Sequence, residues 1–139
     1  MTLRDLNESL GLHLPPKRVL VVEDHLPLLH RLAEYLEESG HEVTALQGVT
    51  EVSGSSATGP GPGDEVVEVD LRDVQVAFLD HYFLSREWNG ARLARELTLW
   101  NDPKILGMSS DARANQRILE AGATLTLPKA ELMRLLALS

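Results

Sequence analysis

The stretch VQVAFLD, residues 74–80, runs through apolar side chains and ends at the carboxylate of Asp80. A second apolar stretch, VLVV at residues 19–22, ends in the acidic pair Glu23 and Asp24. Short apolar runs of this kind, bounded by polar residues, are typical of buried parallel strands. Because open α/β sheets bind ligands at the carboxyl ends of their strands, we expect these three carboxylates to share one site.

Two further strands end in polar residues that suit the same site. ILGM at residues 105–108 is followed by Ser109, and TLTLP at residues 124–128 is followed by Lys129. A few carboxylates are enough to hold Mg²⁺, which prefers oxygen ligands and keeps several waters. The cluster therefore predicts a magnesium site in which Asp80 attacks a phosphoryl donor, while a hydroxyl and an ammonium group stabilise the phosphoryl oxygens.

The rest of the chain alternates between strand-like and helix-like segments, which predicts an α/β fold with a doubly wound, five-stranded parallel sheet and helices on both faces. A helix is expected to begin at Pro27, a favourable first-turn residue, and to stop at Gly40. The expected strands are residues 19–22, 42–46, 74–79, 104–108 and 124–127, and the later helices are residues 91–100, 113–121 and 130–138.

Two segments fall outside this alternation. Residues 1–16 form an N-terminal arm whose leucines have helical spacing, so a short helix is expected there, either packed on the domain or offering a surface for self-association or docking. Residues 48–72 hold an insertion that includes SGSSATGPGPGD at residues 53–64, which cannot hold a helix. We expect a flexible surface segment there, followed by a valine-rich strand at residues 65–69.

Composition limits the classes of partner. The chain of 139 residues carries 13 Lys and Arg against 21 Asp and Glu, a net charge of -8, which argues against binding nucleic acid or anionic membranes. The absence of cysteine excludes disulfides and thiol chemistry. No signal peptide or membrane-spanning run is visible, so a single cytoplasmic domain is expected.

Four motifs together resemble the receiver domain of the bacterial two-component response-regulator family. They are VLVVEDH (19–25), VAFLDHYF (76–83), ILGMSS (105–110) and GATLTLPKA (122–130). The resemblance covers residues 17–139 and implies a flavodoxin-like fold with strand order 2-1-3-4-5. It also implies Mg²⁺-dependent phosphotransfer from a histidine kinase and a conformational switch.

The resemblance assigns a role to each site residue. It makes Asp80 the phosphoacceptor, with Asp24 and the backbone carbonyl of Tyr82 as direct Mg²⁺ ligands and Glu23 acting through water. Ser109 would donate a hydrogen bond to the phosphoryl group, and Lys129 would pair with it. The chain would then be no enzyme in the ordinary sense, since it would catalyse only its own phosphotransfer and dephosphorylation.

The sequence departs from the family at two positions near the lysine. The family has a proline in a cis peptide after the lysine, whereas Ala130 stands here; a non-proline cis bond costs roughly 3–4 kcal/mol, so we predict a trans peptide. Thr126 replaces the aromatic residue expected three positions before Lys129, so any switch must use another route.

The loop after Asp80 is longer than usual for the family, and the insertion is expected to replace the second helix. Tyr82, Phe83 and Trp88 are expected to cover the pocket edge or fill the core, with a partner surface as the alternative. Tyr82 and Asp111 are placed to influence hydrolysis of an aspartyl phosphate, with Tyr82 as a shield against water. None of the five histidines shows transition-metal spacing; His25 and His81, which each follow a pocket carboxylate, are expected to face solvent, with a place at the rim of the site as the alternative.

Three classes of function remain open. The first is a single-domain receiver that is phosphorylated by a histidine kinase or phosphotransfer protein and docks a downstream protein, with a homodimer as a further option. The second is a phosphorylation-independent receiver-like interaction module, which Ala130 and Thr126 favour and the intact acidic set opposes. The third, a phosphatase, is disfavoured because Tyr82 stands where that chemistry usually needs a second acid.

Overall fold

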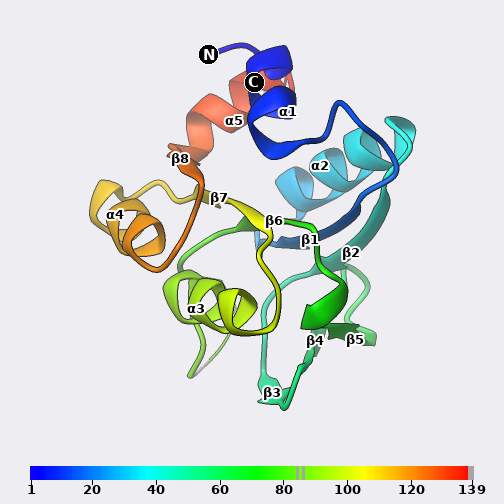
Figure 1. Ribbon diagram of the computed structural model, residues 1–139, viewed down its shortest axis with the longest axis vertical. Helices are drawn as coiled ribbons and strands as arrows, with labels where there is room; N and C mark the ends of the chain where they lie inside the picture. Colours follow the sequence, from blue (N-terminus) through cyan, green and yellow to red (C-terminus); the bar gives the residue numbers. More distant parts are fainter. Residues whose placement is uncertain (84, 86, 138–139) are drawn as a thin grey trace.

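The computed structural model describes residues 1–83, 85 and 87–137 (Figure 1). The elements in chain order are α1 (Leu3–Leu10), β1 (Arg18–Val22), α2 (Leu26–Glu38), β2 (Glu42–Leu46), β3 (Glu51–Ser53), β4 (Ser56–Pro60), β5 (Val66–Asp70), the 3-10 helix η1 (Leu71–Asp73), β6 (Val76–Leu79), α3 (Gly90–Trp100), β7 (Lys104–Met108), α4 (Ala112–Glu120), β8 (Leu125–Leu127) and α5 (Lys129–Leu135).

The central sheet has five parallel strands in the order β2-β1-β6-β7-β8. This is the predicted 2-1-3-4-5 order, since β6, β7 and β8 are its third, fourth and fifth strands along the chain. In the register, Val22 lies opposite Leu79, so the residues that follow them leave the sheet side by side. The predicted α/β fold class and strand order are confirmed.

Each face of the central sheet is covered by its own layer (Figure 1). Along β1, Val19 and Val21 pack with α1, α2 and α5, while Leu20 and Val22 pack with α3, α4 and the inserted segment. The two layers bury a nearly continuous set of aliphatic side chains, which is the expected result for a parallel sheet covered on both sides. None of the helices described is both long and apolar enough to cross a membrane.

The N-terminal arm is a packed part of the fold. α1 begins with a capping box formed by Thr2 and Asp5 and ends at Gly11, which has a φ of 73°. Leu6 and Leu10 are buried against the face that α2 and α5 also cover. Because its apolar side chains already lie in the core, the helix offers no leucine stripe for docking.

The insertion is ordered, which contradicts the expectation of a flexible surface segment. It forms an antiparallel sheet in the order β3-β4-β5, and no α-helix lies between β2 and β6 along this fully described stretch. Ala57 is buried, and a Cβ on Gly59 would lie 1.9 Å from the carbonyl oxygen of Gly48. The small residues that argued against a helix therefore let β4 approach neighbouring backbone closely.

Candidate functional site

The carboxyl ends of β1 and β6 bring three acidic side chains together. Glu23 and Asp24 follow β1 directly, Asp80 follows β6, and the backbone N–H of Asp80 donates to the carbonyl of Val22 at 3.0 Å. One oxygen from each carboxylate lies within 4.8 Å of the other two. Glu23 and Asp80 are buried, whereas Asp24 is exposed and leaves the cluster open to solvent.

Lys129 completes this cluster. Its Nζ lies 2.8 Å from Oε1 of Glu23 and 3.1 Å from Oδ2 of Asp80. The lysine is the first residue of α5, directly after Pro128, which caps the helix. Within the described residues the only cis peptide is Pro15–Pro16, so the peptide between Lys129 and Ala130 is trans, as predicted.

Burial and charge act against each other at these residues. Burial raises the pKa of Glu23 to about 7, and the nearby charge of Asp80 adds to this rise. The hydrogen bond from Lys129 and that from the backbone N–H of His25, at 3.0 Å, act in the opposite direction. Burial also lowers the pKa of Lys129, but Glu23 and Asp80 outweigh it and the pKa lies above its usual value. The ammonium is therefore charged at neutral pH.

The acidic cluster fits a hard divalent cation. Lys129 Nζ donates to Oε2 of Glu23 at 3.1 Å, while the buried Oε1, although only 2.8 Å from Nζ, accepts no hydrogen bond from the residues that the structure describes. Buried carboxylate oxygens normally have a partner, so this atom can still accept a ligand. With Asp24 and Asp80 it forms an all-oxygen donor set of the kind that Mg²⁺ prefers.

Ser109 lies at the end of β7, the strand next to β6, and is buried. Its Oγ accepts a hydrogen bond from the backbone N–H of Asp111 at 3.1 Å. The hydroxyl proton is not used in that bond, so it can be donated to another acceptor.

Asn115, which the sequence analysis did not identify, fixes the backbone around Ser109. Its Oδ1 accepts from the N–H of Ser109 at 2.9 Å, and its Nδ2 donates to the carbonyls of Ser109 at 3.0 Å and of Leu127 at 3.1 Å. One buried amide thus joins the ends of β7 and β8 to α4. The available signal was a polar residue between Ala114 and Ile118, on the buried side of a predicted helix.

The residue after Asp80 is buried, which corrects the expectation that His81 faces solvent. Its backbone N–H donates to Oδ1 of Asp80 at 2.8 Å, and its carbonyl accepts from the N–H of Gly90 at 2.9 Å. Burial lowers the pKa of His81, and the charge of Arg117 lowers it further. A neutral imidazole therefore packs beside the acidic cluster, while His25 is exposed as expected.

Gly90 is a second residue for which the sequence predicted no role at the site, although it stands directly before the helix expected at residues 91–100. A Cβ at this position would lie 2.4 Å from the carbonyl oxygen of Asp80 and 2.9 Å from the Cα of His81. The first turn of α3 therefore packs directly on the backbone that carries Asp80.

The aromatic residues of the loop have different positions. Phe83 is buried in the core, and Trp88 is half-buried beneath the guanidinium of Arg92, 4.0 Å from the ring centre. Tyr82 is 56% exposed, and its hydroxyl accepts a hydrogen bond from Arg117 at 3.4 Å. Residues 84 and 86 of this loop lie outside the described residues. The role of the Tyr82 backbone carbonyl as a metal ligand stays a prediction.

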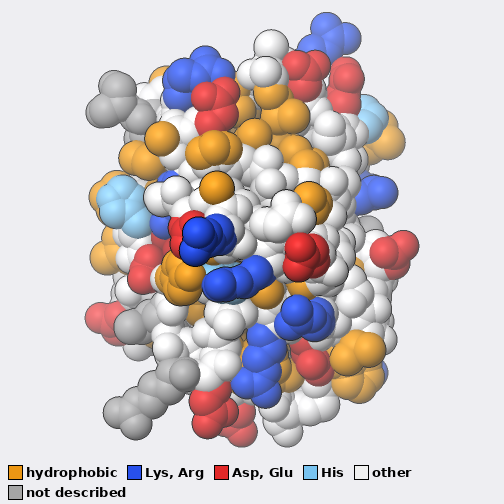
Figure 2. All heavy atoms as spheres, turned by 90° about the vertical axis from the view of Figure 1, so that its left-hand side faces the viewer, with side chains coloured by type: hydrophobic (Ala, Val, Ile, Leu, Met, Phe, Trp, Pro, Cys, Tyr) orange, Lys and Arg blue, Asp and Glu red, His pale blue; other side chains and the backbone are white. Residues whose placement is uncertain are grey.

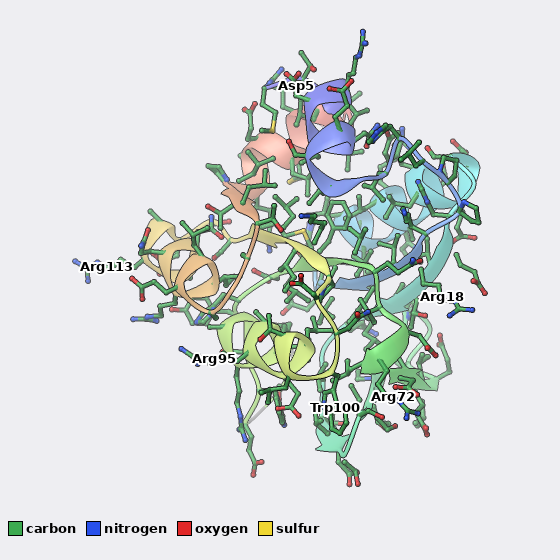
Figure 3. All side chains as sticks on the ribbon, viewed as in Figure 1. Asp5, Arg18, Arg72, Arg95, Trp100 and Arg113 are labelled. Carbon is green, nitrogen blue, oxygen red and sulfur yellow. The ribbon has the colours of Figure 1, made fainter. Side chains whose placement is uncertain are left out.

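Basic side chains gather on the face formed by α3 and α4 (Figure 2). Arg92 and Arg95 on α3 and Arg113 and Arg117 on α4 are exposed, and none pairs with a described carboxylate. Arg95 and Arg113 extend from the same side of the molecule (Figure 3). The two helices carry these arginines against Glu96 and Glu120, so together they are positively charged although the whole chain has a net charge of -8.

Comparison with known proteins identifies solved structures that share this fold. No protein-family model matches the sequence, and the search of curated proteins found no match. A receiver domain protein (CheY-like) from Methanospirillum hungatei has a TM-score of 0.56 and 18% identity, covering 86% of this chain and 90% of that chain. The chain has the fold of a response-regulator receiver domain.

Two further solved receivers carry ligands. A response regulator from Burkholderia pseudomallei, solved with a phosphorylated aspartic acid, calcium ion and citrate, has a TM-score of 0.57 and 20% identity over 86% of this chain and 66% of that chain. One from Thermotoga maritima, in complex with Mg²⁺ and BeF, has a TM-score of 0.52 and 20% identity over 86% of this chain and 98% of that chain. The TM-scores show that these proteins share the fold of this chain.

Proposed function

We propose that this receiver accepts a phosphoryl group on Asp80 from a histidine kinase or phosphotransfer protein, in a Mg²⁺-dependent reaction, and signals by docking a downstream protein. The observation that carries the proposal is the ammonium of Lys129, 3.1 Å from Oδ2 of Asp80, beside carboxylates that lie within 4.8 Å of one another. The Burkholderia and Thermotoga structures support it, since one holds a phosphorylated aspartic acid and the other Mg²⁺ with BeF.

The site residues have distinct tasks in this reaction. The N–H of His81 holds Oδ1 of Asp80, which orients the carboxylate for attack. A carboxylate oxygen forms a bond to phosphorus while the P–N bond of the phosphohistidine donor breaks, and the leaving imidazole keeps the electron pair and takes a proton from solvent. Bound Mg²⁺, held by Glu23, Asp24 and Asp80, would supply counter-charge for the phosphoryl oxygens.

Two side chains of this receiver are suited to the product. The charged ammonium of Lys129 already contacts Asp80, so it can pair with an oxygen of the phosphoryl group without a large movement. The hydroxyl of Ser109 keeps a free proton for donation to another phosphoryl oxygen. We propose no activity on other substrates beyond this self-modification and its hydrolysis.

The exposed arginines of α3 and α4 suggest where a downstream protein docks. Arg117 bonds to Tyr82, which lies two residues after the phosphoacceptor, so this face is connected to the site. An acidic partner surface would complement it. This route needs no aromatic residue at Thr126.

A second candidate is a receiver-like interaction module that works without phosphate. The observation in its favour is that Lys129 already pairs with both Glu23 and Asp80, so the pocket is neutralised in part before any phosphoryl group arrives. The same docking face would then act constitutively.

One experiment separates the two candidates. The purified protein is incubated with Mg²⁺ and acetyl phosphate, and its intact mass is recorded beside that of Asp80→Asn and of a sample with EDTA. A phosphate adduct that forms in the wild type with Mg²⁺, and neither in Asp80→Asn nor in EDTA, supports Mg²⁺-dependent phosphorylation of Asp80. An adduct that persists in Asp80→Asn contradicts the assignment of the acceptor, and no adduct under any condition favours the phosphate-independent module.

A further inference from the structure

A groove opens between β2, the edge of the central sheet, and β5, the edge of the inserted sheet. We propose that this groove binds an extended, basic peptide segment of a partner protein, which pairs with β5 as a fourth strand of the inserted sheet. The inference uses none of the residues of the acidic cluster and rests on backbone pairing and charge.

β5 has one free edge. Gly61 N–H donates to the carbonyl of Glu65, and Leu71 N–H donates to that of Ser55, at the two ends of the ladder with β4. In an antiparallel pair the residues that face the neighbour alternate along the strand. The N–H and C=O groups of Val66, Glu68 and Asp70 therefore point away from β4, and no described strand pairs with them.

β2 is open in the same way. Glu42 N–H donates to the carbonyl of Lys17, and Glu23 N–H donates to the carbonyl of Leu46, so alternate residues of β2 face β1. Val43 and Ala45 lie between them and direct their backbone groups outward. β2 ends the five-stranded sheet, and none of the strands described continues it.

The two open edges line one cavity of about 370 Å³. Val43 and Thr44 contribute from β2, and Glu68, Val69 and Asp70 contribute from β5. β2 and β5 lie on the same side of the molecule in Figure 1, and Arg18 and Arg72 extend on that side in Figure 3. An extended segment seated there would find unpaired backbone donors and acceptors on β5, with which it pairs, and on the open edge of β2 across the groove.

The charge of the groove indicates the kind of segment. Four of its lining residues are acidic and one is basic, and they are Glu42, Glu68, Asp70, Asp73 and Arg18. Arg18 is shared between Glu42 at 3.5 Å and Asp73 at 3.8 Å, so it does not neutralise the wall of β5. Arg72 pairs with Asp70 at 2.7 Å, which leaves Glu68 as the free carboxylate of that wall. A segment with Lys or Arg at alternate positions complements it.

A second copy of the same chain is a poorer occupant. Pairing two β5 edges would bring Glu68 and Asp70 against the same carboxylates of the other copy, and like charges on an edge strand oppose such pairing. Val66, 82% exposed on this edge, provides an apolar contact that a β-branched residue of the partner segment can cover.

The test uses a blocked nine-residue peptide of alternating lysine and valine, titrated by calorimetry into the full chain. We expect saturable binding, and at least tenfold slower amide exchange at Val66, Glu68 and Asp70 by NMR, because these N–H groups gain partners. A peptide of the same sequence with alternate amides N-methylated keeps its charge but cannot pair, so it should bind at least tenfold more weakly.

Two variants at Glu68 separate the effect of backbone pairing from the effect of charge. Glu68→Pro removes an outward N–H but no hydrogen bond between β4 and β5, and it should weaken peptide binding at least tenfold. Glu68→Ala keeps that N–H and removes only the charge, so it should weaken peptide binding about threefold. Circular dichroism confirms that both variants fold. Absence of binding, equal binding of the N-methylated peptide, or self-association through this edge in sedimentation would each overturn the proposal.

Discussion

Nζ of Lys129 lies 3.1 Å from Oδ2 of Asp80, although alanine and not proline follows the lysine. The side chain is aimed by the start of α5, since Pro128 ends β8 and Lys129 opens the helix. The position at which β8 ends therefore determines whether the Lys129 side chain reaches Asp80. This contact joins two residues 49 positions apart and closes the site from the side of β8.

Lys129 should be important for stability as well as chemistry. Lys129→Ala leaves Glu23 and Asp80 buried without their cation, and should lower the free energy of unfolding at pH 8 by about 3 kcal/mol in metal-free protein. Urea denaturation measures the loss. Lys104→Ala removes an exposed lysine without an ion pair among the described residues and should change stability by less than about 0.5 kcal/mol. Equal effects of the two variants would contradict the role given to Lys129.

Glu23 should make the stability of the metal-free protein depend on pH. Its pKa in the folded protein is raised to about 7, from an ordinary 4.5, so the folded state binds more protons than the unfolded state between these values. The contribution of Glu23 is therefore fully present below about pH 4.5 and is lost as the pH rises through 7. Urea denaturation in EDTA at pH 5 and 8 should show a steeper decline for wild type than for Glu23→Gln. The same slope in both proteins would refute this.

Gly90 should be required for the position of Asp80. In Gly90→Ala, the new Cβ would lie 2.4 Å from the Asp80 carbonyl, so α3 or the loop must shift, and labelling by acetyl phosphate should slow at least tenfold. We expect a stability loss of about 1–3 kcal/mol. Gly63→Ala is the matched control, because its Cβ meets only the end of the Glu65 side chain, and its labelling rate should match wild type.

Asn115 should hold the ends of β7 and β8 in place. Asn115→Leu removes three hydrogen bonds from buried backbone groups, and should lower the free energy of unfolding by about 2–3 kcal/mol. Gln116→Leu on the same helix changes an exposed residue and should cost less than about 0.5 kcal/mol. Thermal and urea unfolding compare the two. A loss below 1 kcal/mol in Asn115→Leu would show that solvent replaces these bonds.

Tyr82 should protect a phosphorylated Asp80 from water. Its exposed ring lies 4.6 Å from the ring of His81, next to the phosphoacceptor, and its hydroxyl accepts a hydrogen bond from Arg117, so Tyr82→Ala should shorten the phosphate half-life at least twofold. Tyr82→Phe keeps the ring and loses only the hydroxyl contact, so its half-life should stay close to that of wild type. Decay of the adduct by intact mass provides the measurement, and equal half-lives in all three proteins would dismiss the shield.

Much of the fold was predictable because its signals are local. Apolar runs that stop at Glu23, Asp80 and Ser109 mark strands and their ends within a few residues of sequence, and parallel strands place such ends on one edge. The convergence of the acids was expected from this pattern with the first and third strands as neighbours, whereas the strand order was implied by the resemblance to receiver domains. The insertion was expected to be flexible because its Gly, Pro and Ser content gives no periodic signal, whereas its order comes from pairing between β4 and its neighbours.

The sequence alone thus determined which residues end the strands, since hydrophobic periodicity and the polar or turn residues that end a strand are properties of short segments. Only the tertiary structure decided that Lys129 reaches Glu23, 106 positions away, that His81 is buried, and that Asn115 and Gly90 support the site. It also decided which strand edges stay open. These features depend on distances between segments far apart along the chain, which packing fixes and local composition does not encode.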